Sequence, residues 1–433
     1  MTTLREPMSL KIYRAVSLCA GPVAKIALDR RLKAGKEDAA RINERRGAPS
    51  HERPEGRLVW IHGASVGESL SVIPLIERLD DDFPETRFLV TTGTVTSAAL
   101  MRERLPTNAI HQYIPLDHPA YVREFMDHWR PDAALFVESE FWPNLILAAR
   151  KTAPFCALVN GRVSPKSFAD WKSQPNAIKY LLSVFDVMIG QDQQNAERLE
   201  ALSGRKVLMF GNLKNAAAPL PADEATLAHF KADIGERVRW LAASTHPGEE
   251  QTIVAAHKNL ANRAPNLLTM IAPRHPSRGD EVAEIARAAG LVVAQRSKNE
   301  KITDETNVYV ADTLGELGVF YRLCEIAFIG GSITPKGGHN PLEPARLGSA
   351  ILHGPEVFNF DDTYRILRRA GGAALVRNDR EMATAIRRLM GDEKTRKAMI
   401  QSARDFAEAN ARKTLDDIAE TLAGGLSASV SAQ

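Results

Sequence analysis

Short runs of apolar and β-branched residues alternate along this chain with longer segments whose apolar residues recur at helical spacing. The pattern starts at Leu58 and continues through most of the 433 residues. Such alternation is typical of parallel β-sheets covered by helices, so we expect an α/β fold. The candidate strands are residues 58–62, 88–92, 134–137, 155–160, 187–190 and 207–210 in the first half, and residues 240–243, 267–272, 291–294, 308–311, 326–329 and 350–352 in the second.

The candidate strands form two groups on either side of the Ala- and Pro-rich segment 216–221, which suits a linker. The chain is also too long for one typical hydrophobic core. We therefore predict two doubly wound, Rossmann-like domains, residues 51–218 and 222–423, that face each other across a cleft. The Ser- and Ala-rich residues 424–433 are expected to form a disordered tail.

The first 50 residues differ in charge from the rest of the chain. They hold eleven Lys or Arg residues and five acidic ones, a net charge of +6, so the remainder carries −3 of the total +3. Residues 8–28 are apolar but are interrupted by Lys11, Arg14 and Lys25, which is a poor match to a membrane span. We interpret residues 1–50 as a membrane-proximal segment that lies at an anionic membrane surface, and the alternative is a terminal helix packed on its own domain. The predicted apolar face comprises Leu10, Ile12, Tyr13, Val16, Leu18, Val23 and Ile26.

The composition, 44% hydrophobic and 25% charged, argues against wholesale disorder and against a multi-pass membrane protein. The three cysteines, Cys19, Cys156 and Cys324, lie far apart and lack metal-ligand spacing. This usage suits a reducing compartment and argues against a disulfide framework. The turn after the first candidate strand does not match the Gly-x-Gly-x-x-Gly fingerprint, so dinucleotide binding is unsupported.

An acidic residue, Glu68, lies in the small-residue turn that follows the strand at 58–62. A helix is expected to begin next to it, near Ser69. Because ligands bind beyond the carboxyl ends of parallel strands, this carboxylate is a candidate general base that deprotonates an attacking hydroxyl. The alternative is a structural role, in which the carboxylate interacts favourably with the helix dipole.

Acidic and aromatic residues follow the strand at 134–137, where Glu138 and Glu140 precede Phe141 and Trp142. In an extended backbone the two carboxylates would share one face and repel each other. The alternative is one structural carboxylate that accepts backbone N–H groups at a helix start. We interpret the two aromatic residues as part of the core, because large aromatic side chains usually report packing.

Basic side chains end several candidate strands. Arg162 and Lys214 follow strands of the first half, and His246 and Arg274 follow strands of the second half. Each of them alone could be a surface residue, but their recurrence at successive strand ends is not easily a coincidence. The set predicts an anionic ligand that bears phosphate or carboxylate groups.

Two glycine-containing turns of the second half are typical of ligand-binding loops. The turn at 312–317 offers Gly315 and backbone amides to a phosphate, and the alternative is that its acid only satisfies the N-terminus of the following helix. In the run 337–344, Asn340 is a suitable N-cap, Pro341 suits the first helical position, and Glu343 falls three residues after the cap. The Glu343 carboxylate would close a capping box or bind a ribose hydroxyl, and the alternative is a well-capped structural helix.

In their order and spacing, these motifs closely resemble the 3-deoxy-D-manno-octulosonic acid (Kdo) transferase family, glycosyltransferase family 30. The resemblance implies a GT-B fold and the transfer of Kdo from CMP-Kdo to a lipid A precursor, lipid IVA, with inversion at the anomeric carbon, in lipopolysaccharide core biosynthesis. It implies no metal, no cofactor and no nucleic acid partner, and a place at the cytoplasmic face of the inner membrane of a Gram-negative bacterium. The segments that carry it are the Glu68 turn and residues 138–144, 160–162, 211–214, 244–250, 273–276, 312–317 and 337–344.

The resemblance also implies roles for individual residues. Glu68 matches the general base, and Glu138 and Lys214 match residues that stabilise the transition state. The acceptor is expected to bind to the first domain and CMP-Kdo to the second. The residues expected to contact CMP are Pro273, Arg274, Leu314, Gly315, Glu316, Asn340, Pro341, Leu342 and Glu343.

Two other functions stay open from the sequence. One is a GT-B transferase or epimerase that acts on UDP-linked sugars. The other is a membrane-associated scaffold that keeps a sugar-nucleotide pocket without catalysis, against which the presence of Glu68, Glu138 and Lys214 argues. The N-terminal segment is shorter and more charged than the usual anchor of the family, which leaves a spanning topology open. No motif specifies the number of Kdo units, the acylation or phosphorylation of the acceptor, or the oligomeric state.

Overall fold

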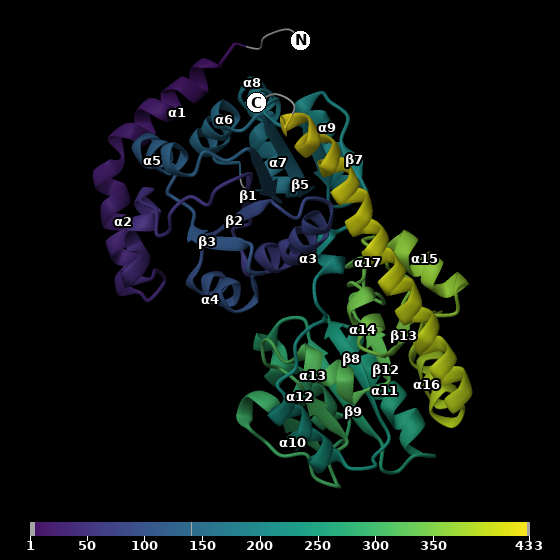
Figure 1. Ribbon diagram of the computed structural model, residues 1–433. Coiled ribbons are helices and arrows are strands. Elements are labelled where there is room, and N and C mark those ends of the chain that lie inside the picture. Colours follow the sequence, from purple (N-terminus) through teal and green to yellow (C-terminus); the bar gives the residue numbers. More distant parts are fainter. Residues whose placement is uncertain (1–4, 140, 431–433) are drawn as a thin grey trace. The chain divides into compact units, whose positions relative to one another are not determined.

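The computed structural model describes residues 5–139 and 141–430, and of residues 428–430 it describes the backbone only. The chain divides into two compact units, which can be followed in Figure 1. The first unit combines the residues up to Ala217 with those from Ala411 onward, and the second unit is Ala218–Asn410. The division falls within the segment 216–221.

The first unit contains a seven-stranded parallel sheet in the order β3-β2-β1-β4-β5-β6-β7. Its strands are β1 (Leu58–His62), β2 (Arg87–Thr92), β3 (Ala109–Tyr113), β4 (Ala133–Val137), β5 (Phe155–Gly161), β6 (Val187–Gly190) and β7 (Leu208–Met209). The strand order reverses between β1 and β4. In open parallel sheets, such a reversal creates a crevice at the carboxyl ends of the strands, where ligands bind.

Helices cover both faces of this first sheet. They are α1 (Met8–Cys19), α2 (Gly21–Lys33), α3 (Val66–Asp82), α4 (Val95–Arg104), α5 (Pro119–Trp129), α6 (Pro143–Thr152), α7 (Pro165–Lys172), α8 (Pro175–Leu182) and α9 (Gln193–Ser203), with short 3-10 turns η1 (Ala39–Arg46) and η2 (Leu213–Ala216). On one face, Phe125 of α5 and Ile146 of α6 belong to one buried apolar cluster with Trp60 of β1. On the other face, Leu75 of α3 belongs to a second cluster that includes Val59 of β1.

Local sequence signals start these helices. Ser65, Thr94 and Asp192 each accept a hydrogen bond from a backbone N–H in the first turn of α3, α4 and α9. Proline occupies the first turn of α5, α6, α7 and α8. Both devices deal with N–H groups that have no partner at a helix start. The loops that join strand ends to helices are therefore fixed by residues of the loops themselves.

The second unit repeats the design with a seven-stranded parallel sheet in the order β10-β11-β9-β8-β12-β13-β14. Its strands are β8 (Arg239–Thr245), β9 (Leu268–Pro273), β10 (Val293–Gln295), β11 (Val308–Val310), β12 (Ile326–Ile329), β13 (Ala350–His353) and β14 (Ala373–Leu375). The order reverses between β8 and β12. Its helices are α10 (Glu224–Ile234), α11 (Glu249–Ala261), α12 (Gly279–Ala288), α13 (Leu317–Leu323), α14 (Leu342–Arg346), α15 (Asp361–Arg369) and α16 (Asp379–Gly391), with 3-10 turns η3 (Pro276–Arg278) and η4 (Arg296–Lys298).

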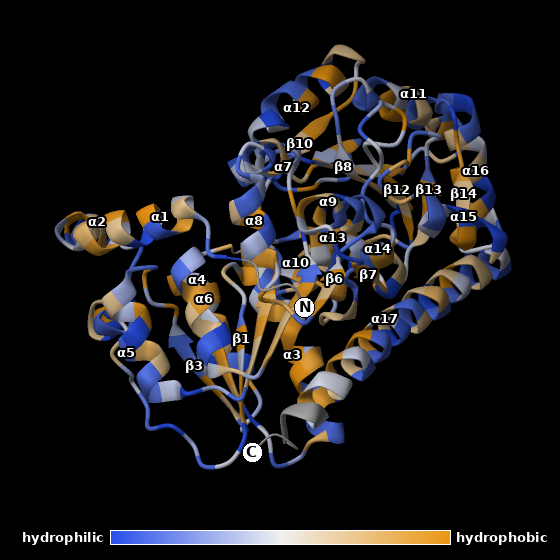
Figure 2. Cartoon of the chain, turned by 90° about the horizontal axis from the view of Figure 1, so that it is seen from above, coloured by the Kyte–Doolittle hydropathy of each residue, from blue (hydrophilic) through white to orange (hydrophobic). Residues whose placement is uncertain are grey.

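The N-terminal helices α1 and α2 are amphipathic in a way that differs from the prediction. Leu10 is buried in the core of the first unit, and Tyr13 donates a hydrogen bond of 2.9 Å to Asp117. Both residues therefore face the protein, although they were predicted to belong to the outward apolar face. The large apolar residues of these two helices that are exposed are Met8, Ile12, Val16, Leu18, Val23 and Ile26. Figure 2 shows the apolar colouring along both helices, and among the described residues no helix is long and apolar enough to cross a membrane.

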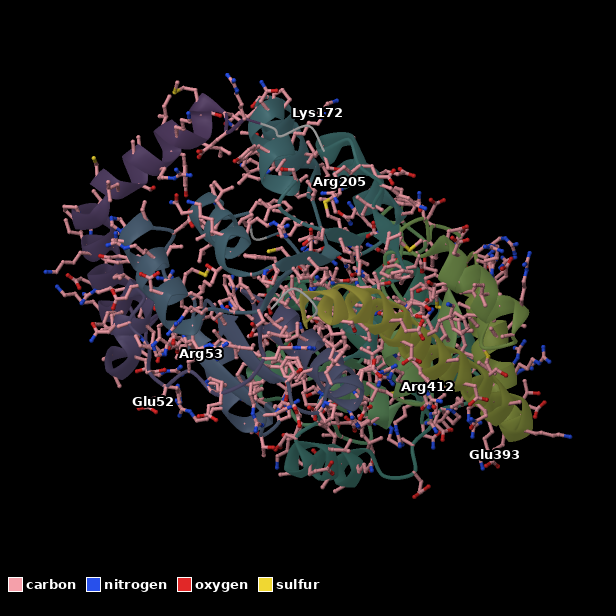
Figure 3. All side chains as sticks on the ribbon, turned by 45° about the horizontal axis from the view of Figure 1, so that its top comes forward. Glu52, Arg53, Lys172, Arg205, Glu393 and Arg412 are labelled. Atoms are coloured by element: carbon pink, nitrogen blue, oxygen red, sulfur yellow. The ribbon has the colours of Figure 1, made fainter. Side chains whose placement is uncertain are left out.

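The last helix, α17 (Glu393–Val430), begins in the second unit and ends in the first. It continues through residues 424–430, where a disordered tail was predicted, while residues 431–433 lie outside the described part. The helix persists because Leu426 is buried in the core of the first unit and Gly425 lies against the Phe155 ring. Charged side chains such as Glu393 and Arg412 are exposed along α17 (Figure 3).

Candidate functional site

Glu68 lies in the first turn of α3, directly after the loop that leaves β1. Its carboxylate accepts a hydrogen bond of 2.8 Å from the backbone N–H of Ala64 and one of 2.7 Å from the hydroxyl of Ser65. The Ser65 oxygen in turn accepts the N–H of Glu68 at 3.3 Å. The side chain is thus fixed in one orientation, and only 8% of the residue is exposed. The helix-start role that was the alternative for Glu68 is present in the structure, and it also preorganises the carboxylate.

Glu138 and Lys214 form an ion pair at the carboxyl end of the same sheet. Glu138 directly follows β4 and is 2% exposed, whereas the Lys214 side chain, on η2, is 35% exposed. Asn160 at the end of β5 bridges the two segments, because its Nδ2 lies 3.5 Å from Glu138 Oε1 and its Oδ1 accepts the N–H of Leu213 at 2.9 Å. The carboxylate is therefore buried with a cation whose other side meets solvent.

Two of these residues adopt a left-handed backbone. Glu138 has φ +62° and Asn160 has φ +55°. Such a conformation costs an L-residue other than glycine roughly 1–2 kcal/mol, and it concentrates at functional sites. The strain is sustained here by the buried ion pair and by the bridging amide.

Lys214 also reaches the start of α3. A Cβ placed on Gly67 would lie 3.5 Å from Lys214 Cε and 3.7 Å from its Nζ, and Gly67 immediately precedes Glu68. The structure therefore brings the three predicted catalytic residues, Glu68, Glu138 and Lys214, to one end of the sheet of the first unit.

The remaining residues of the acidic and aromatic motif follow the prediction only in part. Glu140 lies outside the described residues, so the predicted carboxylate pair stays a prediction. Phe141 packs against the core of the first unit. Trp142, which was predicted to be core, is 46% exposed. It stands at the N-cap of α6, in the turn that follows β4, and its side chain is only partly covered there.

The second unit has a pocket at the carboxyl ends of β8, β9 and β11, with a volume of about 170 Å³. Four of the predicted CMP contacts line it, and Ser244 at the end of β8, with φ +56°, lines it as well. The backbone of Gly315 is also left-handed, with φ +84° and open space beside its Cα. The four predicted residues are Pro273, Arg274, Leu314 and Gly315.

Glu316 does not line this pocket, since its carboxylate is engaged elsewhere. Arg296 on η4 donates two hydrogen bonds to it, of 2.6 and 3.0 Å, and the hydroxyl of Thr313 donates a third. The hydrogen bonds from Arg296 lower the pKa of the Glu316 carboxyl below its ordinary value. This acid therefore fixes the loop that forms the pocket wall, and Arg296 is a partner that the sequence analysis missed.

The run 337–344 forms a tight loop and a short helix outside the lining of that pocket. Gly337 and Gly338 have φ of +88° and +72°, and a Cβ on Gly337 would lie 2.5 Å from the Asn359 amide, so only glycine fits there. Asn340 accepts the N–H of Leu342 at 3.0 Å, as expected of a capping side chain. Pro341 stands at the N-cap, one position earlier than predicted, and α14 begins at Leu342.

Within α14, Leu342 is buried and Glu343 is exposed in the first turn. The side chains of Glu343 and Asn340 are hydrogen bonded to each other, so this acid interacts with the predicted capping residue, and its contact with a backbone N–H or a ribose hydroxyl stays a prediction. Among the described residues, no group of three or more His, Cys, Asp or Glu side chains is arranged to hold a metal ion.

Comparison with known sequences identifies the family. A family model described as 3-deoxy-D-manno-octulosonic-acid transferase (kdotransferase) matches residues 40–217. The 3-deoxy-D-manno-octulosonic acid transferase of Rickettsia bellii is 32% identical and covers 94% of this chain and 97% of its own length. A protein of Arabidopsis thaliana named as a probable mitochondrial 3-deoxy-D-manno-octulosonic acid transferase is 35% identical over 83% of each chain.

Comparison with solved structures shows the fold. The UDP-GlcNAc 2-epimerase of Neisseria meningitidis is similar with a TM-score of 0.56, at 13% identity, over 85% of this chain and 100% of its own. Two parallel-sheet, Rossmann-like domains of the GT-B type are thereby confirmed. With the sequence relatives, the conclusion is that this chain belongs to the 3-deoxy-D-manno-octulosonic acid (Kdo) transferase family, a family of glycosyltransferases.

Proposed function

We propose that this protein transfers Kdo from CMP-Kdo to the lipid A precursor lipid IVA, with inversion at the anomeric carbon and Glu68 as the general base. Membership of the family supplies the transferase activity and the Kdo group. The observation that supports the catalytic assignment is the convergence of Glu68, Glu138 and Lys214 at the carboxyl end of one sheet.

The proposed reaction is a single displacement. A hydroxyl oxygen of the acceptor sugar bonds to the anomeric carbon of Kdo while its proton passes to the Glu68 carboxylate. The bond between that carbon and the phosphate oxygen of CMP breaks, and its electron pair leaves with CMP. Attack from the face opposite CMP inverts the configuration. The hydrogen bonds from Ala64 and Ser65 hold the base in place, and a positioned base contributes about 10²–10⁴-fold to the rate.

Lys214 would supply electrostatic stabilisation in this scheme. Its ammonium group is held by Glu138 on one side and meets solvent on the other. It would offset the negative charge of the Kdo carboxylate or the charge that develops on the departing CMP phosphate. A cation fixed before the reaction costs no reorganisation when that charge develops.

The second unit would bind the donor. Arg274 at the mouth of the pocket is exposed, as a partner for phosphate must be. The left-handed Gly315 leaves backbone free for close approach. The pocket volume of about 170 Å³ suits one part of a nucleotide rather than the whole. The residues 340–343 would complete the CMP contacts from the neighbouring loop.

The N-terminal helices would place the enzyme at a membrane. Exposed apolar residues on α1 and α2 lie among Lys11, Lys25 and Arg30, and this chemistry suits the anionic cytoplasmic leaflet. The proposed location is therefore the cytoplasmic face of the inner membrane of a Gram-negative bacterium, which is also where a lipid acceptor would be met.

The test of this function is Glu68→Gln in the full-length chain, with CMP-Kdo and lipid IVA as substrates and mass spectrometry of the products. We expect kcat to fall by about 10²–10⁴-fold because the proton acceptor is lost, with CMP affinity unchanged because the donor binds elsewhere. Glu77→Gln is the matched control, since Glu77 is an exposed residue of the same helix. It should turn over like the wild type.

Two results would contradict the proposal. Ordinary turnover by Glu68→Gln would remove the base assignment. Turnover of a UDP-linked sugar by the wild type, without any use of CMP-Kdo, would remove the donor assignment.

A further inference from the structure

Two histidines of the second unit, on two different loops, form a hydrogen bond with each other. His246 follows β8, and His339 lies in the glycine-rich loop before α14. Their Nε2 atoms are 2.9 Å apart, and their ring planes differ by only 10°. The two residues are 93 positions apart in the chain, so the bond joins loops that the sequence does not connect.

A buried carboxylate organises the same two loops. Glu249, at the start of α11, is fully buried and accepts four backbone N–H groups. One comes from His246 at 2.9 Å, and the others come from residues 331, 332 and 333 at 2.7 to 3.0 Å. Because the carboxylate is satisfied by the backbone, it leaves the histidine rings to pair with each other.

A glycine leaves room for the two histidine rings, and a tyrosine fixes the backbone of one of them. Gly331, with φ +67°, lies beside both rings, and a Cβ at this position would be 3.3 Å from each of them. Tyr364 on α15 donates a hydrogen bond of 2.8 Å to the backbone carbonyl of His339. The surrounding groups therefore fix the positions of the two histidines, and their contact is not a chance contact at the surface.

The bond needs particular protonation states. One ring must donate an Nε2–H and the other must accept it, so at least one ring has to be neutral. Burial is the main reason that the pKa of both rings is lowered, that of His339 to about 4. Arg274, His275 and Lys336 act in the same direction, and Glu249 opposes them at His246. The bond is therefore retained near neutral pH.

We propose that the His246 and His339 pair is a clasp that positions the donor-binding residues. His246 lies two residues after Ser244, which lines the pocket, and His339 immediately precedes Asn340. Closing the clasp sets the position of Asn340 relative to the pocket wall before the donor arrives, which reduces the ordering that binding would otherwise require. Both histidines are positioning residues. The inference rests on the proposed donor site.

The experiment replaces either ring by one of similar size without nitrogen, in His246→Phe and His339→Phe. We expect each variant to raise the KM for CMP-Kdo and the Kd for CMP about tenfold, with kcat within about threefold, because binding now has to order the loop. The double variant should lose no more than the weaker of the two single variants, because both remove the same bond. His339→Gln restores a donor and an acceptor near the same place, so it should recover most of the affinity.

The matched control is His229→Phe on α10, a residue whose side chain is 61% exposed. It makes the same chemical change away from the clasp and should bind CMP like the wild type. Thermal melting checks that every variant is folded. If the ring replacements prevent folding, His246→Ser and His339→Ser, which do not fill the site, carry the same expectation.

The outcomes separate this inference from the proposed function. Absence of CMP binding by the wild type would defeat the donor site itself. If the wild type binds CMP, then equal affinity in folded His246→Phe and His339→Phe overturns the clasp. Additive losses in the double variant overturn it as well, because they would indicate two independent contacts.

Discussion

At the scale of single residues, the same hydrogen bonds of the Glu68 carboxylate stabilise the start of α3 and orient the proposed base. The hydroxyl of Ser65 and the N–H of Ala64 bind it as a helix start requires. The same contacts aim a carboxylate at the carboxyl end of the sheet. A loss of activity in a Glu68 variant therefore contains a structural part, which a neighbouring residue can be used to measure.

Ser65→Ala isolates that structural part. It removes the N-cap and one of the two hydrogen bonds to Glu68 but keeps the carboxylate. We expect the start of α3 to lose about 1 kcal/mol of local stability, seen as roughly fivefold faster amide exchange there. Transfer should fall much less than in Glu68→Gln. If Ser65→Ala is as inactive as Glu68→Gln, the carboxylate acts through helix structure and not as a base.

The ion pair of Glu138 and Lys214 leads to a second residue-scale prediction. Lys214→Met leaves the buried carboxylate without its cation, which we expect to destabilise the first unit by about 2 kcal/mol, since the half-exposed lysine reduces the usual cost. Adding Glu138→Gln removes the orphan charge and should recover most of that loss. The stability of both variants is measured by urea denaturation of the full chain, with amide hydrogen exchange in the first unit as the readout.

Activity should not follow stability in these variants. The double variant is expected to be as inactive in Kdo transfer as Lys214→Met, because the cation that stabilises the transition state is still missing. Recovered transfer in the double variant would show that Lys214 acts only by neutralising Glu138.

Site residues were predicted best from the sequence where they directly follow a recognisable apolar strand. Pro273 and Arg274 could be placed at the pocket because they directly follow an apolar strand. The partners Asn160 of Glu138 and Arg296 of Glu316 could not be paired in advance, since 22 and 20 residues separate them and the sheet brings them together. Trp142 was misplaced because aromatic character does not tell whether a turn is covered.

At the scale of elements, strands β3 and β14 were not predicted, the first because polar residues interrupt it and the second because it is short. Strand β3 contains His111 and Gln112, and strand β14 has only three residues, so neither stood out from loop sequence. Both belong to the sheets through ladder hydrogen bonds with apolar neighbours. Parallel order itself came from the alternation of strands and helices, which is a property of whole segments.

The outward face of α1 supports a prediction on membrane attachment. Ile12 and Val16 are 56% and 62% exposed, so replacing them does not disturb the core. We expect Ile12→Gln with Val16→Gln to reduce binding to vesicles that contain anionic lipid by at least tenfold, because each buried apolar side chain contributes about 1.5–3 kcal/mol. Vesicle sedimentation of the full chain measures the partition.

Ser9→Gln on the same helix is the control, since Ser9 is exposed and the substitution removes no apolar area. It should bind vesicles like the wild type. Unchanged binding by the double glutamine variant would mean that α1 does not insert its apolar face and that the attachment, if any, lies elsewhere.

At the scale of the whole molecule, one helix belongs to the cores of both units. Met399 of α17 is buried in a cluster of the second unit, and Leu422 of the same helix is buried in a cluster of the first. The second domain was predicted to run to residue 423, whereas the structure groups the residues from Ala411 onward with the first unit. The unit to which a segment belongs depends on the surface against which it packs. The sequence of a single helix does not contain that information.

This arrangement predicts that each half of α17 stabilises a different unit. Leu422→Ala should cost the first unit about 2–5 kcal/mol through lost burial and a cavity. Amide exchange on α3, whose Leu75 shares that cluster, should accelerate, while exchange on α16 stays at the wild-type rate. Met399→Ala should do the reverse, because Met399 packs with Met382 of α16. Equal acceleration on both helices in either variant would mean that the two units unfold as one, so that α17 couples their stability rather than serving each core separately.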